Sequence, residues 1–284
     1  MRPCFQVEIV TPKKVLLNGL WFGPRKARTA LIFVHGLTAS AFSLARLRDE
    51  LTDGKTAILV FNNRGFEQIA EVKKRKGQKT EWIPAGAGRE VFKESVDDIQ
   101  GAVNFAKRQG AREIFLVGHS TGAQKIVYWA ARSNRTSPVR GLVLLGPLSD
   151  YAGTAKKYRA ALKYAHALIK KGKKREFMPT KFGHWFPIDA QRFVSLYDPA
   201  SAEEIFTYAS GKRPATFREV RLPVLAVFAG TDEHADRPVE RIATWFKQNG
   251  ARRVAIMPNV GHSLRGAEKR TAKTIRQFMK EAGQ

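Results

Sequence analysis

The feature that most constrains the fold is a five-residue turn with the pattern G-x-S-x-G, at residues 118–122. It follows the apolar run 114–117 and leads into the helix-forming run 123–129. A strand, this turn and a helix together place a serine hydroxyl above a parallel sheet. Both glycines are a steric requirement, because a Cβ at either position would collide with a neighbouring strand or helix. The pattern predicts that Ser120 has a strained backbone and stands at a helix N-terminus, which favours developing negative charge.

Apolar runs of strand length alternate with amphipathic runs of helical length along most of the chain. Besides the run before the turn, buried strands are expected at residues 30–34, 57–61, 141–145, 224–228 and 253–257. Helices are expected at about residues 41–51, 90–108, 238–248 and 264–280. An N-terminal hairpin is expected to pair residues 5–10 with 15–22, and residues 62–89 to form a long loop. This alternation predicts an α/β fold with a doubly wound, mostly parallel sheet.

The alternation stops at residues 146–147 and resumes at residue 222. The chain between them contains an amphipathic helix near residues 154–171, an aromatic stretch at 182–187 and a helical run at 200–210. The interruption follows the sixth core strand, so it predicts a helical cap over the carboxyl ends of the strands, where ligands bind in open α/β sheets. We expect a core domain of residues 1–146 and 217–284 and a helical cap or lid of residues 147–216.

The composition of the 284-residue chain suits one large α/β domain or a core with an insertion. A single cysteine, Cys4, excludes an internal disulfide and a cysteine-rich zinc site. The sequence shows neither a membrane-spanning apolar run nor an N-terminal signal segment, so a cytoplasmic location is expected.

The net charge is +25, from 50 Lys and Arg against 25 Asp and Glu. Such a charge is compatible with nucleic acid or an anionic membrane surface as a partner. The densest basic runs, 73–76 and 170–175, interleave no aromatic residues as a base-stacking surface would. A solvated basic surface is therefore favoured over either partner.

A serine hydroxyl needs a base that accepts its proton, because its own pKa lies far above neutrality. Among six histidines, His262 is favoured because it lies between the last strand and the last helix, beside a glycine. His35 is expected to brace the loop after its strand, and His119 to point away from the serine hydroxyl. The remaining three are expected on a helix surface, in the inserted segment and on the loop that carries the acid: His166, His184 and His234.

The base in turn needs a carboxylate that fixes its tautomer and stabilises the imidazolium. Asp232 is favoured because it follows the strand at residues 224–228, again at a carboxyl end. Asp236, which fits a helix cap, and Asp150, after the preceding strand, remain alternatives.

The negative oxygen that forms in acyl transfer needs two backbone N–H donors, each worth roughly 3 kcal/mol. One is expected from Thr121, directly after the serine. The other is expected from Leu37, in the loop that follows the strand at residues 30–34. Such a reaction needs no metal and no organic cofactor, so none is expected.

The order Ser120, Asp232, His262 resembles that of the α/β hydrolases and differs from the orders in chymotrypsin and subtilisin. Segments that resemble the DUF1749-like branch of this superfamily are residues 61–65, 94–99, 118–122 and 185–187. The resemblance covers nearly the whole chain and implies the α/β-hydrolase fold with a catalytic triad on these three residues. Some fungal members of the branch are siderophore ester hydrolases. Their substrate is not carried over, because the inserted segment that shapes the pocket is individual to this chain.

The residues together predict a cytoplasmic serine hydrolase of the carboxylesterase type, which cleaves small or medium-sized esters through an acyl-enzyme intermediate. Thioesterase, lactonase and amidase activities remain alternatives on the same triad, whereas a dehalogenase would carry an aspartate in place of Ser120. The alternative from another class is a non-catalytic protein that binds nucleic acid or anionic lipid. Candidate pocket walls are Arg64, His119, Trp185 and Phe186, although Arg64 could instead fix its loop to the core.

Overall fold

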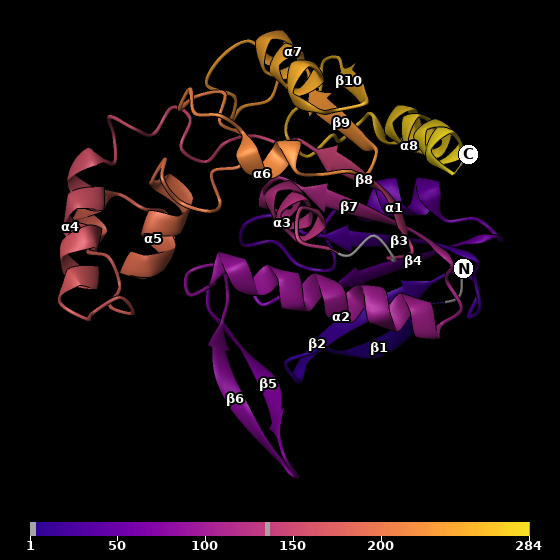
Figure 1. The fold of residues 1–284 in the computed structure, drawn as a ribbon, viewed down its shortest axis with the longest axis horizontal. Coiled ribbons are helices and arrows are strands. Elements are labelled where there is room, and N and C mark those ends of the chain that lie inside the picture. Colours follow the sequence, from indigo (N-terminus) through magenta and orange to yellow (C-terminus); the bar gives the residue numbers. More distant parts are fainter. Residues whose placement is uncertain (1–3, 134–136, 284) are drawn as a thin grey trace.

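The computed structural model describes residues 4–133 and 137–283, which form one ten-stranded sheet with helices on both faces (Figure 1). The strands are β1 (Cys4–Val10), β2 (Val15–Phe22), β3 (Thr29–Val34), β4 (Thr56–Phe61), β5 (Ala70–Lys76), β6 (Lys79–Ala85), β7 (Glu113–His119), β8 (Val139–Leu145), β9 (Val224–Ala229) and β10 (Arg253–Met257). Their spatial order is β10-β9-β8-β7-β3-β4-β2-β5-β6, with β1 paired to β2. The six strands from β10 to β4 are parallel, and the remaining strands pair antiparallel. The predicted α/β fold with a mostly parallel, doubly wound sheet is confirmed.

The helices that cover the parallel strands enclose two separate apolar cores. On one face lie α1 (Ala45–Leu51) and α8 (Glu268–Ala282), and on the other α2 (Ser95–Arg108), α3 (Thr121–Ala130) and α7 (Val239–Asn249). Alternate residues of β3 serve the two cores, with Leu31 packed toward α8 and Ile32 toward α2 and α3. Burial on both faces explains why these strands read as unbroken apolar runs. Within the described ranges, no helix is both long and apolar enough to cross a lipid bilayer.

The segment between β8 and β9 contains α4 (Arg159–Lys170), a 3-10 turn at Thr180–Phe182, α5 (Ala190–Tyr197) and α6 (Ala215–Arg218). Figure 1 shows α4 and α5 beside one end of the sheet, whereas α6 lies close to α3. α4 and α5 pack on one another around a third apolar cluster that includes Tyr158, Ala165 and Phe193. This part of the inserted segment therefore has a small core of its own.

The expected long loop at residues 62–89 contains a β-hairpin instead, so that prediction is wrong. Strands β5 and β6 join at a tight turn where Gly77 has a φ of 62°, and the hairpin projects from the body of the protein (Figure 1). Most side chains of β5 and β6 are exposed or half-buried. Since no face of the hairpin is buried along its length, the sequence carries no alternation of apolar and polar residues that would predict it.

The expected helix at residues 200–210 is also absent from the described structure, although the segment does bury Ile205 and Phe206 in the core. Short polar side chains here bond to nearby backbone groups. Asp198 accepts a hydrogen bond from the Ala200 N–H at 2.7 Å, and Ser201 accepts one from a backbone N–H at 3.3 Å. These local bonds compete with helical ones, so the chain forms successive turns.

Candidate active site

The turn at residues 118–122 has the strained geometry that its sequence predicts. Ser120 stands between β7 and α3 with a φ of 52° and a ψ of −125°, a combination that residues with a side chain rarely adopt. A Cβ on Gly118 would collide with the Gly122 carbonyl, and one on Gly122 with the Val34 carbonyl. The two glycines therefore allow the close approach of strand and helix that presents Ser120 at the N-terminus of α3.

The loops after β9 and β10 bring a carboxylate and an imidazole together at the same edge of the sheet. His262 Nδ1 lies 2.8 Å from Asp232 Oδ2. Because the carboxylate accepts this hydrogen bond, the Nδ1 of His262 carries the proton and the neutral ring keeps Nε2 as an acceptor. The other oxygen, Asp232 Oδ1, accepts from the backbone N–H of His234 at 3.0 Å. Asp232 is therefore held by two contacts and orients His262.

The two alternative acids lie elsewhere. Asp236 Oδ2 pairs with the Arg237 guanidinium at 2.7 Å, and Asp150 Oδ2 accepts from Gln124 Nε2 at 3.0 Å. In the described structure neither aspartate is bonded to an imidazole. Asp232 is thus the aspartate that contacts His262.

Ser120 and His262 line one cavity of about 430 Å³ at the carboxyl ends of the parallel strands. The loop after β3, the segment after β8, Trp185 and Tyr197 of α5 supply further parts of its wall. The close approach to the serine needs Gly36, because a Cβ there would lie 2.9 Å from the Cβ of Ser120. Among the described residues the Ser120 hydroxyl has no hydrogen-bond partner, an openness common in active sites before substrate binds.

Two backbone N–H groups beside the serine donate no hydrogen bond within the described part of the chain. They belong to Thr121, the first residue of α3, and to Leu37, which lines the cavity. The first amides of a helix have no acceptor within it. His35 braces the loop as predicted, since its Nδ1–H donates to the Gly36 carbonyl at 2.9 Å. Burial, with the charge of Lys125 adding to it, lowers the pKa of His35 to about 3 and keeps the ring neutral.

Two further histidines surround His262, a grouping that the sequence analysis missed. His119 Nε2–H donates to the His262 carbonyl at 3.1 Å, and His234 meets the His262 ring edge-on with 4.8 Å between centroids. Glu233 accepts the His262 backbone N–H at 2.8 Å. Burial, and then the charge of His262, lowers the pKa of His119 to about 4, so it stays neutral beside an imidazolium. The sequence signal for this grouping is the run Asp232-Glu233-His234, since all three residues contact His262.

Of the predicted pocket walls, His119 and Trp185 line the cavity. Phe186 does not, so its assignment is corrected: the side chain is 4% exposed and lies in the apolar cluster between α4 and α5. The rings of Trp185 and Phe186 pack edge-on with 4.6 Å between centroids, so that the exposed Trp185 lines the cavity and the buried Phe186 supports it.

Arg64 is also absent from the cavity wall, and its assignment is corrected for a different reason. Its guanidinium binds α2 and the turn before it, with contacts of 2.7 Å to Asp98, 2.9 Å to Asp97 and 3.1 Å to Glu94. These contacts and a bond to the Glu94 carbonyl use four of the five N–H donors of the guanidinium, and the side chain is buried away from the cavity. Arg64 therefore fixes its loop to the core, the alternative that its position left open.

The other two histidines lie in the inserted segment, outside the cavity. His166 is on the exposed face of α4, as predicted, with Nε2 2.7 Å from Asp198. His184 contacts the Phe186 carbonyl and the Tyr197 hydroxyl, each at 2.9 Å. Both contacts are structural, because they join neighbouring parts of the segment around α5.

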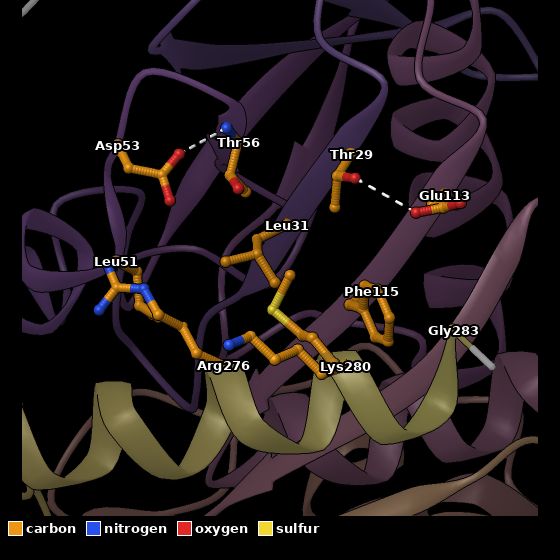
Figure 2. Close-up of a pocket in the computed structure, with 11 residues that line it drawn as sticks. Thr29, Leu31, Leu51, Asp53, Thr56, Glu113, Phe115, Arg276, Lys280 and Gly283 are labelled. Carbon is orange, nitrogen blue, oxygen red and sulfur yellow. Dashed lines mark hydrogen bonds between the residues drawn. The ribbon is translucent and has the colours of Figure 1, made fainter.

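A second hollow, of about 350 Å³, lies at the opposite edge of the sheet. Figure 2 shows Arg276 and Lys280 of α8 on one side of it and Thr29, Thr56 and Glu113 from the starts of three strands on the other. Its lining residues include no histidine that could activate a hydroxyl. This hollow therefore lacks the histidine that accompanies a serine in the cavity at Ser120.

The chain is similar in sequence to one protein family and in structure to several solved proteins. A family model described as "Protein of unknown function (DUF1749)" matches residues 81–278. DcsB, solved in complex with its substrate analogue, is 15% identical with a TM-score of 0.70, and 99% of each chain is covered. The α/β hydrolase GrgF from Penicillium sp. sh18 is 15% identical with a TM-score of 0.69 and the same coverage. The siderophore hydrolase EstB from Aspergillus fumigatus is 16% identical with a TM-score of 0.68, covering 99% of this chain and 98% of EstB.

At these identities the structural likeness shows the fold alone, which is that of the α/β hydrolases. No curated protein matches the chain in sequence. The chemistry of the site must therefore be argued from its own residues.

Proposed function

The chain belongs to the DUF1749 family and has the α/β-hydrolase fold, and we propose that it is a serine hydrolase that cleaves carboxylic esters. One observation carries the proposal: the Asp232–His262 contact of 2.8 Å faces the cavity that Ser120 also lines. A nucleophile, a base and an acid that orients the base are the three groups that acyl transfer needs. The free amides of Leu37 and Thr121 support the same chemistry.

In the proposed mechanism, the Ser120 hydroxyl attacks the ester carbonyl while His262 Nε2 accepts its proton. Asp232 stabilises the imidazolium that results. The N–H groups of Leu37 and Thr121 donate to the negative oxygen of the tetrahedral intermediate. When this intermediate collapses, His262 returns the proton to the leaving alcohol and an acyl-enzyme remains. Water, deprotonated by His262, then attacks the acyl carbonyl and releases the acid with free Ser120.

We further propose that residues 147–216 act as a cap over this chemistry. The separate cluster around α4 and α5 supports this role, and so does the placement of Trp185 and Tyr197 in the cavity wall. A volume of about 430 Å³ suits small or medium-sized substrates. Thioesters, lactones and amides pass through the same kind of intermediate, so they remain alternative substrates.

The proposal is tested with a fluorophosphonate probe, which forms a bond to an activated serine and releases fluoride. Wild-type protein should be labelled at Ser120, and Ser120→Ala should not. Both proteins are then assayed on acyl esters of increasing length and on hydroxamate-linked esters, because the similar structure EstB is named a siderophore hydrolase. Loss of turnover by at least about 10⁴-fold in Ser120→Ala is expected. Absence of labelling in a folded wild-type protein would refute the mechanism.

A second candidate is a non-catalytic protein that binds nucleic acid or anionic lipid. The observation that favours it is the β5–β6 hairpin, which projects from the body and carries the basic run 73–76 (Figure 1). Salt-sensitive binding to random DNA or to anionic vesicles, without any ester turnover, would support this candidate. Turnover that disappears in Ser120→Ala would count against it.

A further inference from the structure

Asp150 is a cavity residue that the proposed mechanism does not use. It follows β8 and lines the same cavity as Ser120. Its Oδ2 accepts a hydrogen bond of 3.0 Å from Gln124 Nε2, which also donates to the Leu148 carbonyl at 2.9 Å. Gln124 is one turn along α3 from Ser120. The helix that presents the nucleophile therefore also positions the carboxyl of Asp150.

The buried cations near Asp150 are committed to other carboxylates. Lys125 Nζ lies 2.6 Å from Glu90, and Arg192 contacts both Glu90, at 3.0 Å, and Glu203. All four side chains are at most 3% exposed. In the described structure no ion pair reaches Asp150 itself. Asp150 is thus a carboxyl in the cavity wall without a cation of its own.

A second acid without an ion pair among the residues described, Glu204, lies near Asp150. Glu204 accepts a hydrogen bond from the Ser149 hydroxyl at 2.7 Å and forms no ion pair within the described ranges. Burial, and then the charge of Glu203, raises the pKa of Asp150 to about 8, although Arg192 and Lys125 act in the opposite direction. Burial also raises the pKa of Glu204 to about 7. This corner of the cavity therefore has an excess of acidic groups, which a bound cation would relieve.

Aromatic walls complete the surroundings. Trp185 and Tyr197 line the cavity, and the Trp185 side chain is 62% exposed. An exposed indole with a carboxyl in the same cavity suits a cationic group, because the ring face attracts positive charge and the carboxylate pairs with it. A purely aliphatic substrate would offer no group that pairs with this carboxyl, whose hydrogen bond from Gln124 comes from the protein itself.

We propose that Asp150 is the specificity residue of this cavity, and that the preferred substrates are esters carrying a primary ammonium group. This proposal rests on the proposed ester hydrolysis at Ser120. Asp150 pairs with the ammonium group, Trp185 offers it a ring face, and the ester carbonyl lies at Ser120.

The kinetic test compares matched esters that differ in charge. Ethyl esters of ω-amino acids with three to six carbons are paired with ethyl alkanoates in which a methyl group replaces the ammonium. Wild-type protein should prefer one amino ester over its neutral partner by about 10- to 100-fold in kcat/KM, the range of a charged hydrogen bond. The preference should increase from pH 6 to pH 8, as Asp150 ionises among Glu203, Glu204, Arg192 and Lys125 while the amine stays protonated.

Asp150→Asn should remove the preference, so that kcat/KM for each amino ester falls to about that of its neutral partner. The variant is expected to fold, because its amide replaces a carboxyl that is neutral at pH 7 and can still accept from Gln124. The matched control is Asp236→Asn, which removes an acid that is paired with Arg237 and is absent from the cavity wall. This control should keep the preference.

A binding test separates this proposal from the proposed hydrolysis. Ser120→Ala protein is titrated by calorimetry with hexylammonium chloride and with 1-hexanol, since neither ligand can be cleaved. Tighter binding of hexylammonium, lost in Ser120→Ala/Asp150→Asn, would support ammonium recognition even if no ester were turned over. Equal binding of the two ligands, or an unchanged preference in Asp150→Asn, would overturn the proposal of ammonium recognition. Neither result would bear on the proposed hydrolysis of neutral esters at Ser120.

Discussion

Glu90→Gln should be strongly destabilising, because Glu90 neutralises two buried cations. Its carboxylate lies 2.6 Å from Lys125 Nζ and 3.0 Å from Arg192 Nη2, and neither cation side chain is exposed. Arg192 retains Glu203 in the variant, whereas Lys125 keeps only a neutral acceptor, Asn63 Oδ1 at 3.1 Å. Removing one partner of a buried pair costs about 3–5 kcal/mol, since it leaves a desolvated charge behind. We expect a loss of this size in the free energy of unfolding.

Urea titration at pH 7.5, followed by tryptophan fluorescence, measures the effect. With an m-value of about 3 kcal/mol/M, the midpoint should fall by about 1–1.7 M. The matched control is Glu281→Gln, which breaks the 2.9 Å pair between Arg253 and Glu281 at the surface, where the side chains are 31% and 43% exposed. This change should cost less than about 1 kcal/mol. Equal midpoints for the two variants would refute the view that buried charge pairs hold the inserted segment to the core.

Acid should weaken the ion pairs that Glu90 forms with Lys125 and Arg192. Burial alone would raise the pKa of Glu90, but Lys125 and Arg192 outweigh it and hold the pKa below its usual value. The folded-state pKa is thus lower than the unfolded one. The stability that Glu90 contributes is therefore present above about pH 4.5 and is lost as the pH falls below that value. Glu90→Gln should flatten the decline of the urea midpoint at acidic pH, and an unchanged decline would contradict the assignment.

Three further outcomes are expected. Asp232→Asn should lower kcat on esters by about 10⁴-fold with an unchanged urea midpoint, because an amide favours the wrong tautomer of His262; a fall below about tenfold would exclude Asp232 as the orienting acid. Gly36→Ala should slow fluorophosphonate labelling by about 100-fold, since its Cβ would lie 2.9 Å from the Cβ of Ser120 and displace the hydroxyl; wild-type labelling would show that the loop moves freely. His35 should make stability fall between about pH 6.5 and pH 4, by about 1.4 kcal/mol per pH unit, because the unfolded ring binds a proton that the folded ring, with a pKa of about 3, does not. His35→Asn should reduce that slope in urea titrations across this range, and an unaltered slope would argue against a buried neutral His35.

Sequence reasoning succeeded where a structure depends on neighbouring residues or on the sheet as a whole. The turn around Ser120 is predictable because its two glycines answer a local steric demand. Asp232 and His262 meet because the carboxyl ends of parallel strands lie at one edge, so residues that follow β9 and β10 are close in space. The direction of the parallel strands is enough to predict that these two side chains meet.

Two of the unsuccessful predictions, for Arg64 and for the β5–β6 hairpin, have different physical causes. The sequence leaves Arg64 either in the pocket wall or fixing its loop to the core, and Asp97 and Asp98 of α2, 33 and 34 residues away, decide for the core by binding its guanidinium. The β5–β6 hairpin was missed because strand prediction relies on an alternating buried face, and this hairpin is exposed along most of its length. Neither the ion pairs of Arg64 nor the exposed pairing of β5 with β6 produces a periodic pattern in the sequence.

The buried charges around α3 combine a predictable position in the fold with partners that the sequence does not reveal. Lys125 is one of 50 Lys and Arg in the chain and follows the polar Gln124 in α3, so nothing in the sequence distinguishes it from a surface lysine. In the structure, one turn of α3 beyond Ser120 carries both Gln124, which holds Asp150, and Lys125, which meets Glu90 and through it Arg192 of α5. The same helical turn therefore sets the distance between the nucleophile, the proposed ammonium-binding carboxyl and the inserted segment. Loss of Glu90 should consequently alter substrate preference as well as stability, because Asp150 and Ser120 are positioned from the helix that Glu90 anchors.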